Sequence, residues 1–362
     1  MSRIASAAVV LGLVTVLAGG ASTPARSSPG TPAATFKACL VTDPGGINDK
    51  SFNELAWRGM QEAVRADGHI EISYLQSMST GDYTTNIDAF IAQKCGIIVT
   101  VGFLMADATE SAAKAHPKRK FAIVDCSYSE ECLAGPKVKN IDQLVYNTVQ
   151  DGFLGGYLAA GLSKTHRVAT FGGENFGTVT IYMDGFWDGV QYYNAQHHAH
   201  VKVLGWSEKT QRGSFIENFT NLIAAQKLTA RFIREGADVI FPIAGGADQG
   251  TSKAVRNADA AGRNVAIEWP DTDGCFSFPK YCKYLLTSVT KGIAESVKTV
   301  MLADARGTFK RIYTGTLAND GVALSPYHDF AARVPARLRA ELARVKAKII
   351  SGQIVPATRS PV

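Results

Sequence analysis

The chain has 362 residues, of which 46% are hydrophobic and 19% are charged, a composition typical of a globular protein with room for two α/β lobes. The formal net charge of +6 is weak, and the sequence has no basic run interleaved with aromatic residues, so nucleic acid is not expected as a partner.

The N-terminal residues have the pattern of an export signal. Arg3 precedes an apolar stretch over 4–18 that is too short to act as a membrane-spanning anchor. We expect a signal peptide over 1–25 and a flexible tether rich in Ser, Thr, Pro and Ala over 26–36. Gly20 stands where a lipoprotein signal would carry cysteine, so a lipid anchor is not supported and the protein is expected to be exported, in the cell envelope or secreted.

A strand, a polar loop and a helix are predicted at the start of the folded region. The apolar run 38–41 ends at Asp43, and a Pro-Gly-Gly turn follows. Ser51 and Glu54 have the spacing of a capping box, so a helix is expected to begin there. In an open α/β sheet such a loop lies at the carboxyl end of a strand, where ligands bind.

The composition of this loop favours a neutral ligand rich in hydrogen-bond donors. Its Lys-Ser pair resembles the end of a phosphate-binding loop, but Pro44 and Asp49 occupy the two glycine positions of that motif. The carboxylates of Asp43 and Asp49 would also repel phosphate. Carboxylates beside the ring of Phe52 suit a sugar or a nucleoside, although Phe52 could instead only pack in the core.

Strands and helices alternate along the rest of the chain, which indicates an α/β fold with two doubly wound lobes around a cleft that closes by a hinge. Lobe 1 is expected over 37–144 with a helix returning within 283–308, and lobe 2 over 145–282 with 309–362. Residues 142–161 show apolar residues at helical spacing. Further strands are expected at 95–101, 121–124, 167–171, 200–205, 239–242 and 264–268, and further helices at 86–93, 107–115, 183–194, 222–235, 250–261, 291–305 and 335–352.

Six cysteines in an exported chain favour disulfide bonds. Two pairs are close in sequence and each could close one loop, and the remaining two cysteines begin predicted strands and could pair by elimination. A metal site is the disfavoured alternative, because there is no C-x-x-C motif. The candidate pairs are Cys126 with Cys132, Cys275 with Cys282, and Cys39 with Cys95.

Five motifs lie in order over residues 37–330: D-P-G-G-I-N-D-K-S-F-N at 43–53, F-G-G at 171–173, M-D-G-F-W-D-G at 183–189, G-A-D-V-I-F-P-I-A-G-G at 236–246 and L-T-S-V-T-K at 286–291. Together they resemble the basic membrane protein family of ABC-transporter substrate-binding proteins, which includes purine nucleoside receptors. The resemblance implies a type I periplasmic-binding-protein fold that closes around a nucleoside.

The resemblance also implies roles for individual residues at the base. Phe52 and Phe219 would sandwich the base, and stacking of this kind contributes roughly 1–3 kcal/mol per base. Asp43 and Asp125 would accept hydrogen bonds from the base. Within the motif at 43–53, Asp49 and Asn53 are expected to order the loop, with direct ligand contact as the alternative.

At the ribose, Asp271 and Lys291 would bind hydroxyl groups, assisted by backbone N–H groups near Gly245. Here the sequence departs from the family pattern, because a Trp-Pro pair precedes Asp271 and Gly274 replaces a glutamine. The full set of expected ligand-binding residues is Asp43, Asp49, Phe52, Asn53, Asp125, Phe219, Gly245, Asp271 and Lys291.

We therefore expect a monomeric, non-enzymatic nucleoside receptor that delivers its ligand to an ABC permease, without a cofactor or a metal. A sugar receptor of the same fold is the first alternative. A nucleoside-processing enzyme or a ligand sensor is a further alternative, although the sequence has neither G-x-S-x-G nor H-E-x-x-H. The histidines within 197–200 are interpreted as a solvated loop.

Overall fold

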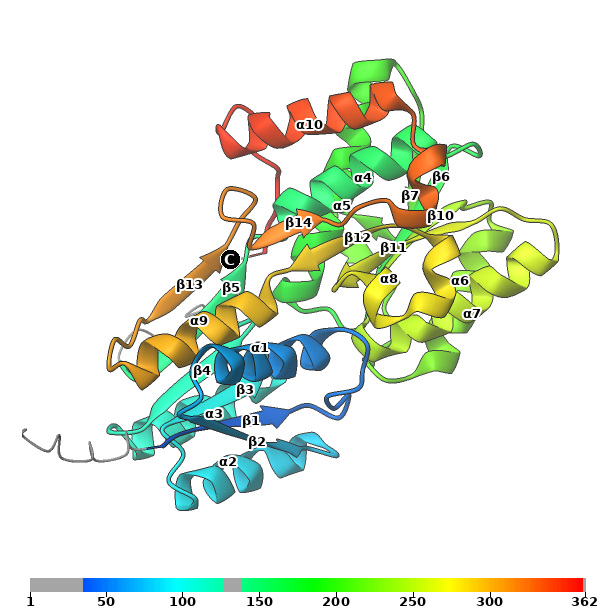
Figure 1. Cartoon of the computed structure of the whole chain (residues 1–362). Helices are drawn as coiled ribbons and strands as arrows, with labels where there is room; N and C mark the ends of the chain where they lie inside the picture. Colours follow the sequence, from blue (N-terminus) through cyan, green and yellow to red (C-terminus); the bar gives the residue numbers. More distant parts are fainter. Residues whose placement is uncertain (1–34, 127–137, 361–362) are drawn as a thin grey trace, which may run out of the picture. The chain divides into compact units, whose positions relative to one another are not determined.

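Two six-stranded sheets organise the computed structural model, which describes residues 35–126 and 138–360 (Figure 1). The first sheet has the order β13-β5-β4-β3-β1-β2, and all its neighbouring strands are parallel. Its strands are β1 (Phe36–Thr42), β2 (Ile70–Gln76), β3 (Ile97–Val101), β4 (Lys120–Val124), β5 (Ile141–Tyr146) and β13 (Ile312–Gly315).

The second sheet has the order β14-β12-β11-β10-β6-β7 and is parallel except for β14, which runs antiparallel to β12. Its strands are β6 (Arg167–Gly172), β7 (Lys202–Leu204), β10 (Val239–Ile243), β11 (Ala266–Asp271), β12 (Leu285–Lys291) and β14 (Val322–Leu324). A short antiparallel pair, β8 (Trp206–Ser207) with β9 (Arg212–Gly213), forms a separate two-stranded sheet that contacts β6 of the second sheet.

Helices pack in pairs, and each sheet carries buried apolar side chains on both faces, as strands of parallel sheets do. The pair α1 with α9 and the pair α2 with α3 belong to the first sheet, whereas α4 with α5 and α6 with α7 belong to the second. The helices are α1 (Phe52–Ala66), α2 (Tyr83–Ala92), α3 (Ala106–Ala115), α4 (Val149–Leu162), α5 (Gly177–His197), α6 (Leu222–Arg234), α7 (Gln249–Ala260), the short α8 (Gly274–Ser277), α9 (Ile293–Ala305) and α10 (Ala336–Ile350). No helix in the described ranges is long and apolar enough to cross a membrane.

Glycines allow α4 and α5 to approach each other more closely than ordinary helices. A Cβ atom at Gly156 would overlap the backbone of Phe186, and one at Gly189 would overlap the backbone of Phe153. Glycine at these positions therefore permits the close packing of the two helices.

Most of the expected elements are present, with their ends shifted by a few residues, but the helical interpretation of 142–161 was wrong in its first part, and several strands, among them β2, β13 and β14, were not predicted. The helical interpretation of 142–161 fails for its first part, which is strand β5, because the apolar spacing continues across a turn into α4. Strand β2 was not predicted, although its residues alternate in burial. The helix expected from Lys291 begins at Ile293, and Lys291 ends strand β12.

Within residues 35–126 and 138–360 the chain crosses between the sheets three times, and two strands join a different sheet from the one that the expected boundaries imply. Strand β12, expected in lobe 1, belongs to the second sheet, whereas β13, expected in lobe 2, belongs to the first. Helix α9 does return to lobe 1, where it packs on α1. The expected signal peptide and most of the tether lie outside the described residues.

The three crossings lie side by side, and backbone hydrogen bonds join them. The N–H of Asn147, after β5, donates to the carbonyl of Gly315 at 2.8 Å, and the N–H of Gly292, after β12, donates to the carbonyl of Gly321 at 2.8 Å. A Cβ atom at Gly321 would overlap the backbone of Gly315. Glycine is therefore required where the crossings touch.

Two of the three candidate disulfides are confirmed. Cys39 pairs with Cys95, with Cα atoms 6.1 Å apart, and Cys275 pairs with Cys282, with Cα atoms 4.6 Å apart. Cys126 is also disulfide-bonded, but its expected pairing with Cys132 lies outside the described residues.

A fully buried carboxyl group on β11 generates the first prediction. Both side-chain oxygens of Glu268 lie without a hydrogen-bond partner among the described residues, and burial raises the pKa of Glu268 from 4.5 to about 8. Because the folded pKa exceeds the unfolded value, this group costs no stability below pH 4.5 and destabilises the fold progressively as the pH rises toward 8. Between these limits the free energy of unfolding should fall by as much as about 1.4 kcal/mol per pH unit, relative to Glu268→Gln.

Urea unfolding of both proteins at several pH values measures this difference. The exposed Glu235→Gln is the matched control and should unfold in parallel with the wild type. Parallel pH profiles for wild type and Glu268→Gln would contradict the prediction.

Candidate functional site

A cavity lies where the carboxyl ends of strands from both sheets meet, and it encloses about 710 Å³ of space, part of it open to solvent. The structure brings all nine expected binding residues to its wall, while their binding role stays a prediction. Lobe 1 contributes Asp43, Asp49, Phe52, Asn53 and Asp125, lobe 2 contributes Phe219, Gly245 and Asp271, and Lys291 projects from the end of β12.

The loop before α1 is ordered by a carboxylate rather than by the expected capping box. Asp49 accepts hydrogen bonds from the backbone N–H groups of Ser51, Asn53 and Glu54 at 2.9, 2.8 and 3.1 Å. Ser51 makes no side-chain cap, and its hydroxyl instead donates to Asp271 across the cleft at 2.8 Å. The capping-box prediction was therefore wrong, and Asp49 fixes the loop.

Asp43 has one oxygen engaged and one available. Its Oδ1 accepts hydrogen bonds from the N–H of Gly45 at 2.7 Å and from Nδ2 of Asn53 at 2.8 Å. Its Oδ2 has no donor among the described residues. Burial, and secondly the charge of Asp49, raise the pKa of Asp43 to about 6. This carboxylate is thus positioned to accept a hydrogen bond from a ligand.

Lys291 joins carboxylates from the two lobes. Its Nζ lies 2.6 Å from Oδ2 of Asp125 and 3.8 Å from Oδ1 of Asp271, and all three side chains are buried. Burial alone would lower the pKa of Lys291, but the charges of Asp125 and Asp271 outweigh that effect and raise it. The ammonium also lies 4.9 Å from the centre of the Tyr182 ring. Lys291 is therefore charged in the folded protein.

Backbone strain is found at two of these carboxylates. Asp125 and Asp271 follow or end their strands with φ of 66° and 64°, in the left-handed region that side chains other than glycine rarely adopt. Strain of this kind costs of order 1–3 kcal/mol and persists where the surrounding structure holds it. It aims both carboxylates at Lys291 and the cavity.

Two aromatic residues of the cavity were missed by sequence reasoning. Phe103 of lobe 1 and Phe176 of lobe 2 stack with ring centres 4.8 Å apart and planes at 23°, and Phe176 lies 6.5 Å from Phe219 at 26°. The signal that could have found them is that each follows a strand end within a few residues. The other missed wall residues are Gly45, Val101, Gly102, Leu104, Thr178, Val179, Ile243 and Gly246.

Two departures from the family pattern, the tryptophan before Asp271 and the glycine at position 274, compensate for each other. The Trp269 side chain is fully buried in the core of lobe 2 and does not line the cavity. A Cβ atom at Gly274 would lie 2.8 Å from Trp269 and 2.6 Å from Leu285. Trp269 thus fills space that a side chain at position 274 would need, and Asp271 still faces the cavity.

The wall combines four carboxylates, one ammonium and parallel aromatic rings, which suits a planar ligand with several donors and disfavours phosphate. Two lobes that meet over such a cavity, joined by three crossings, define a solute-binding protein of the type I periplasmic-binding-protein fold. The chain matches the Bmp family of ABC transporter substrate-binding proteins, PnrA-like, over residues 36–354, and it belongs to that family.

Relatives agree with this assignment, and the expected family and fold are confirmed. The chain is 28% identical to the ABC transporter nucleoside-binding protein BmpA of Lactococcus lactis subsp. cremoris, with 97% of each chain covered. It is 26% identical to basic membrane protein A1 of Borrelia garinii subsp. bavariensis, covering 88% of this chain and 87% of that one.

Solved structures show the same fold at lower identity. An ABC transporter solute-binding protein from Aeropyrum pernix K1 superimposes with a TM-score of 0.79 at 20% identity, covering 90% of this chain and 94% of that one. A periplasmic solute-binding protein from Actinobacillus succinogenes with bound D-allose superimposes with a TM-score of 0.61 at 14% identity. This match covers 83% of this chain and 100% of that one.

The second prediction concerns Lys291. Replacement by methionine leaves buried carboxylates without their counter-charge, and breaking a buried pair in this way typically costs about 3–5 kcal/mol. Lys291→Met should lower the free energy of unfolding at pH 7 by about 3 kcal/mol and by less at pH 4, where carboxylates take up protons.

Urea unfolding at both pH values provides the measurement. Lys346→Met is the matched control, because Lys346 forms an exposed pair with Asp320 at 3.7 Å, and its effect should stay within about 1 kcal/mol. Equal stability of the two variants at pH 7 would contradict the central role of Lys291.

Proposed function

We propose that the protein is the extracytoplasmic receptor of an ABC importer and binds a purine nucleoside in the cavity between its lobes. The observation that carries the proposal is that one cavity is lined by the free oxygen of Asp43, by aromatic rings and by Lys291 with Asp271. A base has a flat face and hydrogen-bond donors on its edge, and a ribose has hydroxyl groups, so the aromatic rings and charged groups of the wall suit the two halves of a nucleoside.

Each half of the ligand has a physical reason to bind. The base would stack between Phe52 and Phe219 and donate hydrogen bonds to Asp43 and Asp125. The ribose hydroxyls would donate to Asp271 and accept from Lys291. A ligand without these hydroxyls would leave buried charges without a partner, which is how such a site rejects analogues.

The family membership supports the rest of the proposal. Substrate-binding proteins of this class present a small molecule to a membrane permease, and the name of the Lactococcus lactis relative states that it binds nucleosides. Export by a signal peptide is consistent with the disulfide bonds. Exported, monomeric and without a cofactor, the protein would act by binding alone.

The third prediction tests the ligand. Ligand-free protein with oxidised disulfides should gain about 2.7 kcal/mol of stability at 100 times the dissociation constant of a purine nucleoside. Phe52→Ala should weaken binding by about 5- to 150-fold, the equivalent of one stacked base. The exposed Phe276→Ala is the control and should leave affinity unchanged.

Thermal unfolding with purine and pyrimidine nucleosides, free bases and sugars makes the measurement, and calorimetry gives the affinities. Stabilisation by sugars alone would replace the nucleoside by a sugar in this proposal. Release of free base from inosine would show an enzyme instead of a receptor.

The fourth prediction concerns pH. A ligand that donates a hydrogen bond to the Asp43 carboxylate requires its ionised form, and the pKa of Asp43 is about 6. Affinity should therefore be constant well above pH 6 and fall about tenfold for each unit below it. Calorimetry from pH 5 to pH 8 measures how affinity depends on pH. The Asp43→Asn variant should bind more weakly at all pH values, but its affinity should not show the fall below pH 6. An identical pH dependence in both proteins would exclude Asp43 as the acceptor.

A further inference from the structure

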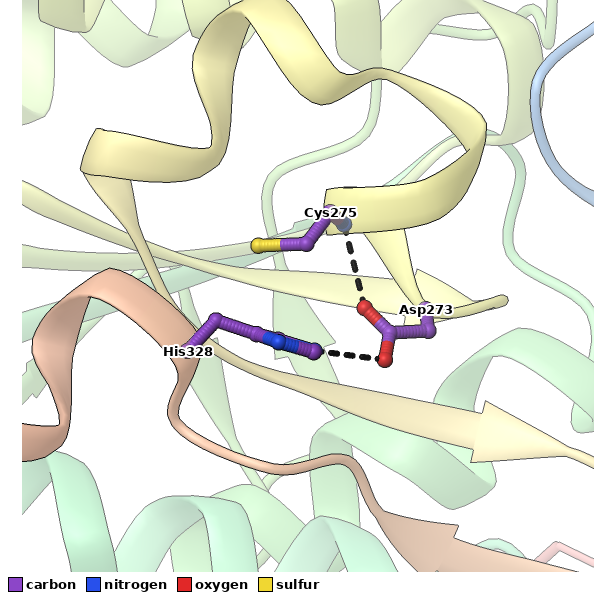
Figure 2. Close-up of side chains that lie close together, drawn as sticks. All are labelled: Asp273, Cys275 and His328. Carbon is purple, nitrogen blue, oxygen red and sulfur yellow. Dashed lines mark hydrogen bonds and ion pairs between the residues drawn. The ribbon is translucent and has the colours of Figure 1, made fainter.

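Three side chains of metal-ligating type gather outside the nucleoside cavity, on the lobe 2 side. Asp273 precedes α8, Cys275 lies within α8, and His328 begins the short 3-10 helix η5 (His328–Arg333). One ligand atom from each lies within 4.8 Å of the other two (Figure 2). Nε2 of His328 is 2.7 Å from Oδ2 of Asp273, and the N–H of Cys275 donates to Oδ1 of the same carboxylate at 3.0 Å.

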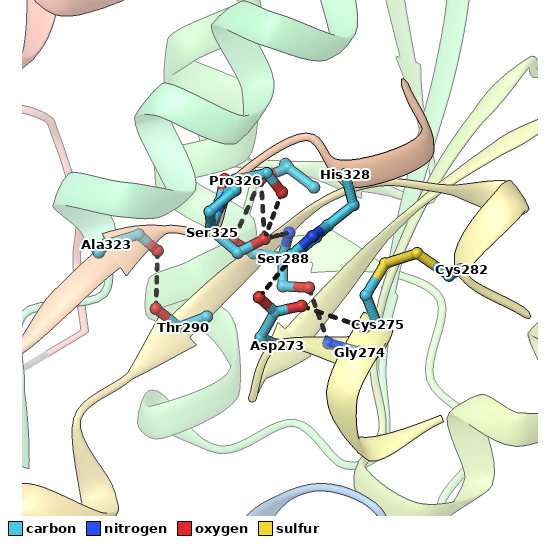
Figure 3. A network of polar contacts seen from close by, with 11 residues as sticks. Asp273, Gly274, Cys275, Cys282, Ser288, Thr290, Ala323, Ser325, Pro326 and His328 are labelled. Atoms are coloured by element: carbon cyan, nitrogen blue, oxygen red, sulfur yellow. Dashed lines mark hydrogen bonds and ion pairs between the residues drawn. A yellow bond between two sulfur atoms is a disulfide. The ribbon is translucent and has the colours of Figure 1, made fainter. Parts of the chain in front are cut away.

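Hydrogen bonds to β12 anchor the segments that carry these side chains, and β12 lies between those segments (Figure 3). On one side, the N–H of Gly274 donates to Oγ of Ser288 at 3.0 Å. On the other side, the N–H of Ser288 donates to Oγ of Ser325 at 2.8 Å, three residues before His328. These bonds do not involve the sulfur atoms, so the cluster is held together independently of the disulfide.

The oxidation state of Cys275 decides how many metal ligands this cluster offers. Imidazole nitrogen, carboxylate oxygen and thiolate sulfur are the three ligand types that Zn²⁺ uses in proteins. In the structure the Sγ of Cys275 is bonded to that of Cys282, so it is not a thiolate. The oxidised protein therefore offers two of the three ligands.

We propose that reduction of the Cys275–Cys282 disulfide completes a Zn²⁺ site made by Asp273, Cys275 and His328. A dithiol reduces the disulfide to two cysteine thiols and is itself oxidised to a cyclic disulfide. Zn²⁺ then replaces the proton of the Cys275 thiol, which is released to solvent. Water completes the tetrahedral coordination.

The geometry needs only small side-chain movements. Ligand atoms around tetrahedral zinc lie roughly 3.3–3.7 Å apart, given bond lengths of about 2.0–2.3 Å. The existing separations, 2.7 Å between His328 and Asp273 and at most 4.8 Å overall, bracket that range. The side chains of His328 and Asp273 are 23% and 18% exposed, so they have room to turn and a path for the ion.

The metal would join different segments from those that the disulfide joins. The disulfide closes a loop within 275–282, whereas the zinc would connect α8 to η5. Reduction would therefore exchange a local link for one between segments that are distant in sequence.

Two single variants provide a matched test. Cys282→Ser and Cys275→Ser both remove the same disulfide and leave one free thiol, but only the first leaves that thiol in the cluster. With Co²⁺ as the probe, Cys282→Ser should show a near-ultraviolet thiolate-to-cobalt charge-transfer band that equimolar Zn²⁺ abolishes, and Cys275→Ser should show none. Adding His328→Ala to Cys282→Ser should weaken Co²⁺ binding by at least tenfold.

Wild-type protein should lack the band when oxidised, gain it after treatment with a dithiol and anaerobic desalting, and lose it on reoxidation. Because the band requires a thiolate ligand, binding at the histidines of 197–200 would not produce it. For the Cys282→Ser and Cys275→Ser variants, circular dichroism and thiol titration confirm a folded chain with one free thiol. The absence of a band in such Cys282→Ser protein, or equal bands in the two single variants, would overturn the proposal.

Discussion

The contact of Lys291 with Asp125 and Asp271 is the interaction on which the cavity depends. It places one positive charge between carboxylates that belong to different lobes and that are buried. Without that charge, both strained aspartates would face each other across a poorly hydrated space, where repulsion is screened weakly. Ser51 adds a second link between the lobes at the same point, through its hydroxyl group on Asp271. The two lobes are therefore joined at the cavity by charged and hydrogen-bonded groups, while aromatic rings form part of the cavity wall.

The aspartates of the cavity differ in how many hydrogen bonds they accept from the protein, and this difference suggests different roles for them. Asp49 is saturated by the backbone of its own loop and so acts as a structural residue. Asp43 is half engaged, and its remaining oxygen is available to a ligand. Because the protein itself engages the oxygens of Asp49 and one oxygen of Asp43, only part of the hydrogen-bonding capacity of these carboxylates is left unsatisfied, which limits the cost of burying them.

The features that could be predicted from the sequence were mainly those set by residues close together in the chain. The alternation of strand, loop and helix revealed the fold class, and the position of Asp43, Asp125 and Asp271 after apolar runs placed each of them at the carboxyl end of a strand. The family resemblance supplied Phe219 and Lys291. Contacts between distant segments were not accessible: the stack of Phe103 on Phe176, the bond from Ser51 to Asp271, and the exchange of β12 and β13 between sheets all depend on tertiary structure. The compensation between Trp269 and Gly274 likewise required coordinates.

The position of Lys291 in the chain has a mechanical consequence. It is the last residue of β12, and the next residue, Gly292, is one of the crossings at which the lobes are joined. When two bodies rotate about a pivot, displacement grows with distance from the axis. A rotation of the lobes about the crossings would therefore displace the backbone of Lys291 less than parts of either lobe that lie farther from them. Because Asp125 and Asp271 belong to different lobes, such a rotation would separate the two carboxylates around a cation that itself moves little.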